Sequence, residues 1–246
     1  MLISPMRKPI NLSIIIPAYN EETKIKRDIA EAIQFLITSK QKGEIIVSTD
    51  GVTDKTNTIV KSLMKVYPNL LLLAEKNKIG KGAAIKKGVA AASGEIIMFA
   101  DAGLCVPYRY ALKGLALLEK GFDCAMGSRA EKGSRILRKQ PLYRYIGSNI
   151  FKWIIHTILH IPHDIKDTQC GFKLYKKITA KKIFHDLQTE AMMFDIEVIL
   201  RLVKNKNKIA TFPVEWKNDE DTKFDPLTGS FKNIKELFLI KIVHRL

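Results

Sequence analysis

The sequence predicts a single α/β domain built around a largely parallel sheet. With 246 residues, 46% of them hydrophobic, the chain can form one large domain with a substantial core, and we expect no second independent domain. In the N-terminal part, short apolar segments of strand length alternate with segments of helical periodicity. Polar and acidic residues directly follow three of these apolar segments.

Four buried strands are expected first. They are LSIIIP, EIIVSTD, LLLLA and EIIMFA, at residues 12–17, 44–50, 70–74 and 95–100. Runs of this kind, apolar without alternation, are typical of strands covered on both faces.

Helical patterns fill the gaps between these strands. The first expected helix is 22–39, with Ile25, Ile29, Ile33 and Leu36 at helical spacing. The second is capped by Thr53 and Asp54 and carries Ile59, Val60, Leu63 and Met64. The third is a small-residue helix at 82–93. Strands joined by helices of this length form right-handed βαβ units and hence a mostly parallel sheet. The first hundred or so residues therefore resemble the nucleotide-binding half of an α/β protein.

Acids stand where three of the strands end. PAYNEE at 17–22 follows the first strand, DGVTD at 50–54 the second, and Asp101-Ala102-Gly103 the fourth. Each also fits a local role, Asn20 and Asp54 as helix caps and Asp50-Gly51 as a turn. Ligands of such sheets bind beyond the carboxyl ends of the strands, so acids converging there in a basic protein favour a ligand site.

Two common nucleotide motifs are absent. The segment NKIGKGAAIKKG at 77–88 lacks the second glycine before the lysine and the hydroxyl after it that a Walker A loop requires. The first strand is followed by PAYNEE and not by a glycine-rich fingerprint, which disfavours NAD binding.

The charge balance indicates anionic partners. Forty-one Lys and Arg against 25 Asp and Glu give a formal net charge of +16, which suits nucleotides, nucleic acid or acidic lipid headgroups. No recognition motif with interleaved aromatic residues supports nucleic acid. Three cysteines, Cys105, Cys124 and Cys170, have no CxxC spacing, so we expect buried free thiols and a reducing compartment.

Two segments could form basic amphipathic helices at a membrane surface. These are residues 150–161, with Phe151, Ile154, Ile155, Ile158 and Leu159 on one helical face, and residues 234–246. Ordinary core packing is the alternative for both.

No run of residues reaches the roughly 18 apolar residues that a transmembrane helix needs, and we expect no signal peptide at the N-terminus. His156, His160 and His163 are spaced like metal ligands, but without a carboxylate pattern we expect them to face solvent or an interface.

Six motifs, in order, resemble glycosyltransferase family 2, and within it the polyprenyl-phosphate glycosyltransferases, the dolichyl-phosphate glucosyltransferase branch above all. They are IIIPAYNEE, STDGVTD, NKIGKGAAIKKGV, the strand-end Asp101, GSR at 127–129 and DTQCGFKLY at 167–175. The resemblance runs from about residue 12 to the C-terminus. It implies a GT-A (Rossmann-like) fold with a mixed, mostly parallel sheet, in which 12–128 binds the nucleotide sugar and 129–246 binds the acceptor and carries membrane-facing helices.

The resemblance implies inverting transfer of a sugar, glucose in this branch, from a nucleotide sugar such as UDP-glucose to a polyprenyl phosphate. It assigns Pro17, Tyr19 and Glu21 to the base and ribose, Asp50 to the uracil edge, Lys81 to the nucleotide, and Asp101 to a Mg²⁺ or Mn²⁺ ion that bridges the diphosphate.

On the acceptor side the resemblance gives Asp167 the place of a catalytic base or an acceptor-positioning residue. Since a phosphate is already an anionic nucleophile, positioning is the larger role we expect. Arg129, Arg138, Arg144 and Lys223 are candidates for binding the diphosphate and the lipid phosphate.

One position departs from the family. The second acid of Asp-x-Asp is Gly103 in this chain, so the metal site is weakened, completed by water and phosphate oxygens, or lost.

Taken together, the resemblance, the basic charge and the two amphipathic segments predict a peripheral enzyme on the cytoplasmic face of a membrane. The alternative functions are transfer to a different glycan or lipid acceptor, and sugar-nucleotide binding without catalysis.

Overall fold

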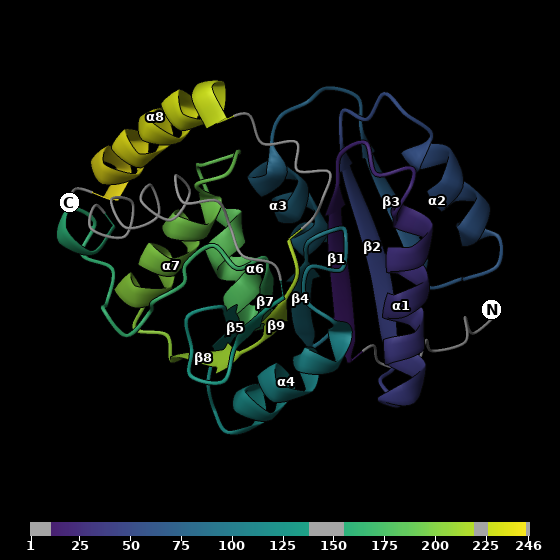
Figure 1. The fold of residues 1–246 in the computed structure, drawn as a ribbon, viewed down its shortest axis with the longest axis horizontal. Coiled ribbons are helices and arrows are strands. Elements are labelled where there is room, and N and C mark those ends of the chain that lie inside the picture. The colour runs from purple at the N-terminus through teal and green to yellow at the C-terminus, as the bar shows by residue number, and fades with distance from the viewer. Residues whose placement is uncertain (1–10, 138–154, 219–225, 245–246) are drawn as a thin grey trace, which may run out of the picture.

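The protein has a seven-stranded sheet flanked by helices on both faces (Figure 1). The computed structural model describes residues 11–137, 155–218 and 226–244. The strands of the sheet, in the order β3-β2-β1-β4-β7-β5-β8, are β1 (Leu12–Ala18), β2 (Gly43–Asp50), β3 (Leu70–Glu75), β4 (Ile96–Ala100), β5 (Cys124–Ser128), β7 (Phe172–Lys176) and β8 (Ile209–Pro213).

The sheet is mixed but mostly parallel, as predicted. β1 pairs in parallel with β2 and with β4, and β5 pairs in parallel with β8. β7 alone among these strands runs antiparallel, between β4 and β5. The start of β7 therefore lies at the same edge as the ends of β1, β2 and β4, which brings residues before 172 to the acid-tipped strand ends.

The two faces of the sheet are covered by different helices. Because side chains alternate along a strand, Ile14 and Ile16 of β1 pack on one face and Ile15 on the other, all fully buried. The first face is covered by α1 (Ile25–Thr38), α2 (Thr56–Met64) and α4 (Ala111–Glu119). The second is covered by α3 (Lys81–Ala91), α6 (Lys177–His185) and α7 (Phe194–Lys204).

The C-terminal helix α8 (Pro226–His244) joins the second layer, at the end of the molecule away from α1 and α2 (Figure 1). Its Leu237 and Ile240 are buried in the same core cluster as α3 and α7. Two short strands, β6 (Arg135–Ile136) and β9 (Glu215–Trp216), pair separately, and a 3₁₀ turn, η1 (Tyr108–Tyr110), precedes α4.

The segment 155–161 packs into the core, not outward. Ile155 and Leu159 are both only 1% exposed, and Ile158 packs against the same core cluster. The described part of this segment therefore shows ordinary core packing, which the sequence left open as the alternative. The prediction that its apolar face meets a membrane is wrong for these residues. Phe151 and Ile154 lie outside the described residues.

Two further observations bear on the sequence predictions. All three cysteines are free, and Cys124 and Cys170 are buried as expected, whereas Cys105 is half-buried. Within the described ranges, no helix combines the length and the apolar character needed to cross a bilayer.

Candidate active site

The loops after β1 and β2 are bonded to each other. Asn20, at a left-handed φ of 53°, accepts a hydrogen bond from the Thr53 backbone N–H at 2.8 Å. Asp54 accepts one from the Thr56 N–H at 2.9 Å, at the start of α2, and one from the Glu22 N–H at 3.0 Å. The N-caps of α1 and α2 are Lys24 and Lys55, so the predicted capping role of Asn20 and Asp54 is wrong, although Asp54 accepts from the first N–H of α2. Both residues instead hold the two loops to each other.

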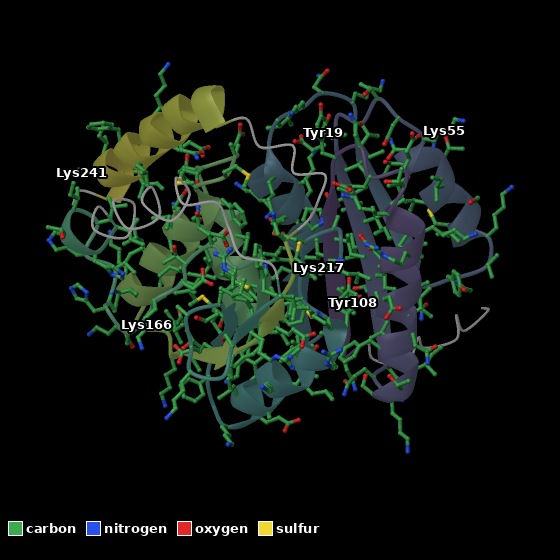
Figure 2. The ribbon with its side chains drawn as sticks, in the orientation of Figure 1. Tyr19, Lys55, Tyr108, Lys166, Lys217 and Lys241 are labelled. Atoms are coloured by element: carbon green, nitrogen blue, oxygen red, sulfur yellow. The ribbon has the colours of Figure 1, made fainter. Side chains whose placement is uncertain are left out.

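Asp50, at the end of β2, shapes the turn before α3. Its Oδ1 accepts hydrogen bonds from the backbone N–H groups of Ile79, at 2.7 Å, and Gly80, at 3.0 Å. The neighbouring Gly51 has a φ of +64°, and a β-carbon there would overlap the backbone of Lys78. Lys78 places its ammonium 3.8 Å from the centre of the Tyr19 ring, at the edge of the sheet where β1 ends (Figure 2).

Asp101 follows β4 and pairs with Lys81, the first residue of α3. Asp101 Oδ1 lies 2.6 Å from Lys81 Nζ, and the two side chains are 28% and 21% exposed. Burial lowers the pKa of Lys81, but the carboxylates of Asp101 and Asp195 raise it more, so the net direction is upward and the ammonium stays charged. The sequence places these residues in different motifs. They meet because the start of α3 and the end of β4 lie at the same edge of the sheet.

Gly171 provides the surface on which the Asp101 carboxylate lies. The Asp101 N–H donates to the Gly171 carbonyl at 2.9 Å. A β-carbon on Gly171 would overlap the carboxylate of Asp101. The glycine of the DTQCGFKLY motif is therefore required for the position of the strand-end acid.

Gly103, at the position of the missing second acid, has a left-handed backbone with a φ of 91°. Its N–H donates at 2.6 Å to Oδ2 of Asp28, a carboxylate on α1 that is 1% exposed. Burial raises the pKa of Asp28, although the Gly103 N–H and Arg27 oppose that shift. The departure from Asp-x-Asp is thus built into the turn, because a φ of this size disfavours any residue with a side chain.

Asp167 and Arg129 form a two-pronged ion pair at the same edge of the sheet. Arg129 donates from Nε to Oδ2 at 2.8 Å and from Nη2 to Oδ1 at 2.7 Å, and its backbone N–H adds a bond to Oδ2 at 2.8 Å. Burial raises the pKa of Asp167, but these bonds from Arg129 lower it more, so the net direction is downward. A carboxylate held in this way is a poor proton acceptor and a good positioning group.

A second ion pair, which the sequence analysis missed, lies beneath the site. Lys173, fully buried on β7, bonds to Asp195 of α7 and donates to the Thr168 carbonyl at 3.0 Å. It therefore holds the segment that carries Asp167. The only sequence signal was a lysine within a strand-like apolar run, because Asp195 stands 22 residues further on.

The other predicted residues have mixed outcomes. Pro17 is buried within β1 opposite Ser48, so it shapes the strand and does not expose its ring. Glu21 is 9% exposed, pairs with Lys24 at 2.9 Å and donates its N–H to Thr56 Oγ1 at 2.8 Å. Arg138, Arg144 and Lys223 lie outside the described residues.

The residues fit a cation carried by the substrate better than a metal site of the protein's own. Among the described residues, no group of three His, Cys, Asp or Glu could hold a metal ion, and this includes His156, His160 and His163. Asp101 offers one partly exposed carboxylate. Mg²⁺ commonly binds through one or two carboxylates together with substrate phosphates and water, so one carboxylate is sufficient for that mode.

Several named enzymes align with most of this chain. A dolichyl-phosphate beta-glucosyltransferase of Trichomonas vaginalis is 31% identical over 252 residues, which cover 96% of this chain and 74% of the relative. The enzyme of that name from Dictyostelium discoideum is 32% identical over 94% of this chain and 74% of its own, and the human one 29% over 94% and 75%.

Solved structures of glucosyl-3-phosphoglycerate synthase from Mycobacterium tuberculosis share the fold. A complex with Mn²⁺, UDP and glucosyl-3-phosphoglycerate has a TM-score of 0.68 and 16% identity, covering 94% of this chain and 80% of that one. A complex with Mg²⁺ and UDP has the same TM-score and identity. The predicted GT-A fold is thereby confirmed.

The family itself is shown by a direct match. The model of the family described as "Glycosyl transferase family 2" matches residues 13–184 of this chain. These residues include the strand-end acids, Lys81, Arg129 and the Asp167 motif. The chain belongs to glycosyl transferase family 2.

Proposed function

We propose that this protein transfers glucose from UDP-glucose to dolichyl phosphate or a related polyprenyl phosphate, with inversion at the anomeric carbon. The observation that carries the proposal is the meeting of two charge pairs, Asp101 with Lys81 and Asp167 with Arg129, at one edge of the sheet. Relatives named dolichyl-phosphate beta-glucosyltransferase support the acceptor and the sugar. Neighbours of the same fold crystallised with UDP support the nucleotide.

On the donor side, the loops after β1 and β2 form the wall for uridine. In this assignment Tyr19 and Glu21 lie beside the base and ribose, and the carboxylate of Asp50 faces the uracil edge while its Oδ1 holds the Ile79–Gly80 turn. The Lys81 ammonium faces the diphosphate. Because it stays charged, it stabilises the charge that grows on the leaving UDP.

Among the described residues, Asp101 is the one whose carboxylate would hold a Mg²⁺ or Mn²⁺ ion that binds with the diphosphate. When bound, such a cation supplies Lewis-acid stabilisation of the leaving group. Lys81 pairs with the Asp101 carboxylate, so a bound cation and the ammonium would compete for it.

In the reaction, an oxygen of the lipid phosphate forms a bond to C1 of glucose as the bond from C1 to UDP breaks. No proton has to be removed from an ionised phosphate, which agrees with a low pKa for Asp167. Asp167 instead orients Arg129, whose Nε and Nη2 are used for the pair, leaving the Nη1 side of the guanidinium for the acceptor phosphate.

We also propose that the protein binds peripherally to an anionic membrane surface through α8. Phe238, Leu239, Ile242 and Val243 are 64%, 42%, 72% and 40% exposed on this helix, beside the exposed lysines Lys235 and Lys241. A basic helix with an apolar outer face suits an acidic bilayer. Free cysteines are compatible with the reducing, cytoplasmic side.

A donor screen tests the function. Purified protein is incubated with polyprenyl phosphate, Mn²⁺ and UDP-glucose, UDP-galactose, UDP-N-acetylglucosamine or GDP-mannose, and lipid-linked sugar is quantified. We expect transfer from UDP-glucose, loss of at least 99% of it in Asp101→Asn, and near-normal transfer in Asp164→Asn, which removes the same charge at an exposed position. Transfer only to another glycan or lipid, or binding of UDP without turnover, would support the alternative functions.

A further inference from the structure

The turn that presents Lys81 is held from two sides. On one side Asp50 binds the N–H groups of Ile79 and Gly80. On the other, the Gly82 N–H donates to the Ala191 carbonyl at 3.2 Å and the Ala83 N–H to the Glu190 carbonyl at 3.0 Å. The contact is close enough that a β-carbon on Gly82 would lie 2.7 Å from Cβ of Phe194 and 2.8 Å from the Thr189 carbonyl oxygen.

The segment that makes this second contact is itself fastened by two buried or half-buried glutamates. Glu197, 1% exposed on α7, accepts from the backbone N–H of Thr189 at 2.7 Å and that of Gln188 at 3.0 Å. Glu236, on α8, accepts from the N–H of Ala191 at 2.9 Å through Oε1 and from the N–H of Met193 at 3.0 Å through Oε2.

We infer that Glu236 is a positioning residue for nucleotide binding, which makes α8 a structural part of the donor site. Its carboxylate fixes Ala191, whose carbonyl holds Gly82, and so sets where the Lys81 ammonium lies relative to Asp101. Both oxygens of the carboxylate accept an N–H, so one side chain holds two backbone groups of this segment. The inference rests on the proposed function, because it takes the Lys81 turn to be where the nucleotide diphosphate binds.

The geometry separates Glu236 from the exposed face of the same helix. Leu237 and Ile240 pack into the core beside it, whereas Phe238 and Ile242 are exposed. Substitution of Glu236 should therefore alter nucleotide binding without altering any membrane binding by the outer face.

The test uses Glu236→Gln in the full-length protein. A glutamine keeps the size and one acceptor but presents an NH₂ group to one of the two N–H donors, so the segment loses one bond and gains a repulsive contact. By calorimetry we expect roughly a three- to tenfold weaker Kd for UDP. In the transfer assay we expect the KM for UDP-glucose to rise by a similar factor and kcat to fall as well, because a displaced Lys81 ammonium stabilises the leaving UDP less well.

Glu190→Gln is the matched control. It removes the same charge from the loop that Glu236 holds. Glu190 is exposed and holds Ala83 through its backbone carbonyl, which the substitution keeps, so UDP binding should stay at the wild-type value. Equal affinity for UDP in wild type and Glu236→Gln would overturn the inference, as would an equal loss in Glu190→Gln. If wild type itself binds no UDP, the proposed function fails instead, so the two failures are distinct.

Discussion

The carboxylate of Asp101 lies directly against the α-carbon of Gly171, in space that no β-carbon could share. The two residues are joined by a backbone hydrogen bond of 2.9 Å from the Asp101 N–H to the Gly171 carbonyl. Because β7 runs antiparallel to β4, the residue before β7 meets the residue after β4. The acid that ends the strand and the glycine of the DTQCGFKLY motif therefore form one structural unit.

Gly171→Ala tests that unit. The added methyl group must displace the Asp101 carboxylate, so we expect kcat to fall by at least about a hundredfold, the cost of misplacing a group at the reacting centre by roughly 1 Å. The transfer assay measures the rate, and circular dichroism checks the fold. Gly121→Ala is the control, since a β-carbon there meets nothing within 4 Å, although its φ of +97° carries backbone strain. Wild-type turnover in Gly171→Ala would show that the position of Asp101 does not limit the reaction.

Asp50 has two separable roles, which a pair of variants distinguishes. Asp50→Ala removes the acceptor for Ile79 and Gly80 and any contact with the base, so UDP binding should weaken by tenfold or more, each lost bond to a carboxylate being worth about 1.5–3 kcal/mol. Asp50→Asn keeps an acceptor oxygen for the turn but turns a donor toward the uracil N–H. We expect it to retain thermal stability while losing the preference for UDP over GDP in calorimetry. An unchanged preference in Asp50→Asn would exclude the contact with uracil.

The pair of Asp167 and Arg129 predicts a defined dependence of stability on pH. Arg129 holds the pKa of Asp167 below its ordinary value of 3.8, so the stabilisation is complete above that pH and is lost as the pH falls through the lowered pKa. Asp167→Asn should reduce the free energy of unfolding by roughly 2–3 kcal/mol at pH 7, somewhat less than for a fully buried pair because Arg129 is partly exposed. The difference from wild type should shrink below about pH 4.

Urea unfolding at pH 7 and at acid pH measures that difference. Asp164→Asn, at an exposed position three residues earlier in the chain, controls for the loss of one negative charge. A difference between wild type and Asp167→Asn that is the same at both pH values would contradict the assignment.

The outer face of α8 predicts where the protein meets a membrane. Phe238→Ser combined with Ile242→Ser removes two side chains that are 64% and 72% exposed and should weaken binding to vesicles of phosphatidylcholine and phosphatidylserine by tenfold or more. Binding by wild type should also weaken as salt screens the headgroups. Ile178→Ser, at a residue 84% exposed on α6, is the matched control and should bind as wild type does. Absence of wild-type binding in vesicle sedimentation at low salt would end the membrane proposal.

Much of this site could be predicted because the strands that carry it are local apolar runs whose ends are visible in the sequence. The expected strands at 12–17, 44–50, 70–74 and 95–100 differ from β1, β2, β3 and β4 by at most one residue at either end. Parallel order then places Asp50 and Asp101 at one edge without further information.

The contacts between distant segments could not be predicted in the same way. The place of β7 depends on pairing with β4, more than seventy residues earlier, and with β5, about fifty residues earlier, for which a single sequence has no local signal. The contact of Gly171 with Asp101 follows from the pairing with β4. The same holds for the bond from the Gly103 N–H to Asp28, 75 positions away. Residues 155–161 were ambiguous because an apolar helical face looks alike whether it meets a core or a lipid surface.

The central claim is that glucose leaves UDP for a lipid phosphate, and the partition of radioactive product tests it most directly. Wild-type protein is given UDP-[¹⁴C]glucose with dolichyl phosphate in detergent and, in a parallel reaction, with 3-phosphoglycerate, the phosphate compound named with the neighbours of the same fold. We predict that the label extracts into organic solvent only when dolichyl phosphate is present, and that none is transferred to 3-phosphoglycerate. The glucose of the lipid product should have the β configuration by proton NMR. Label that stays in the aqueous phase with both acceptors, or that reaches only 3-phosphoglycerate, would contradict the account.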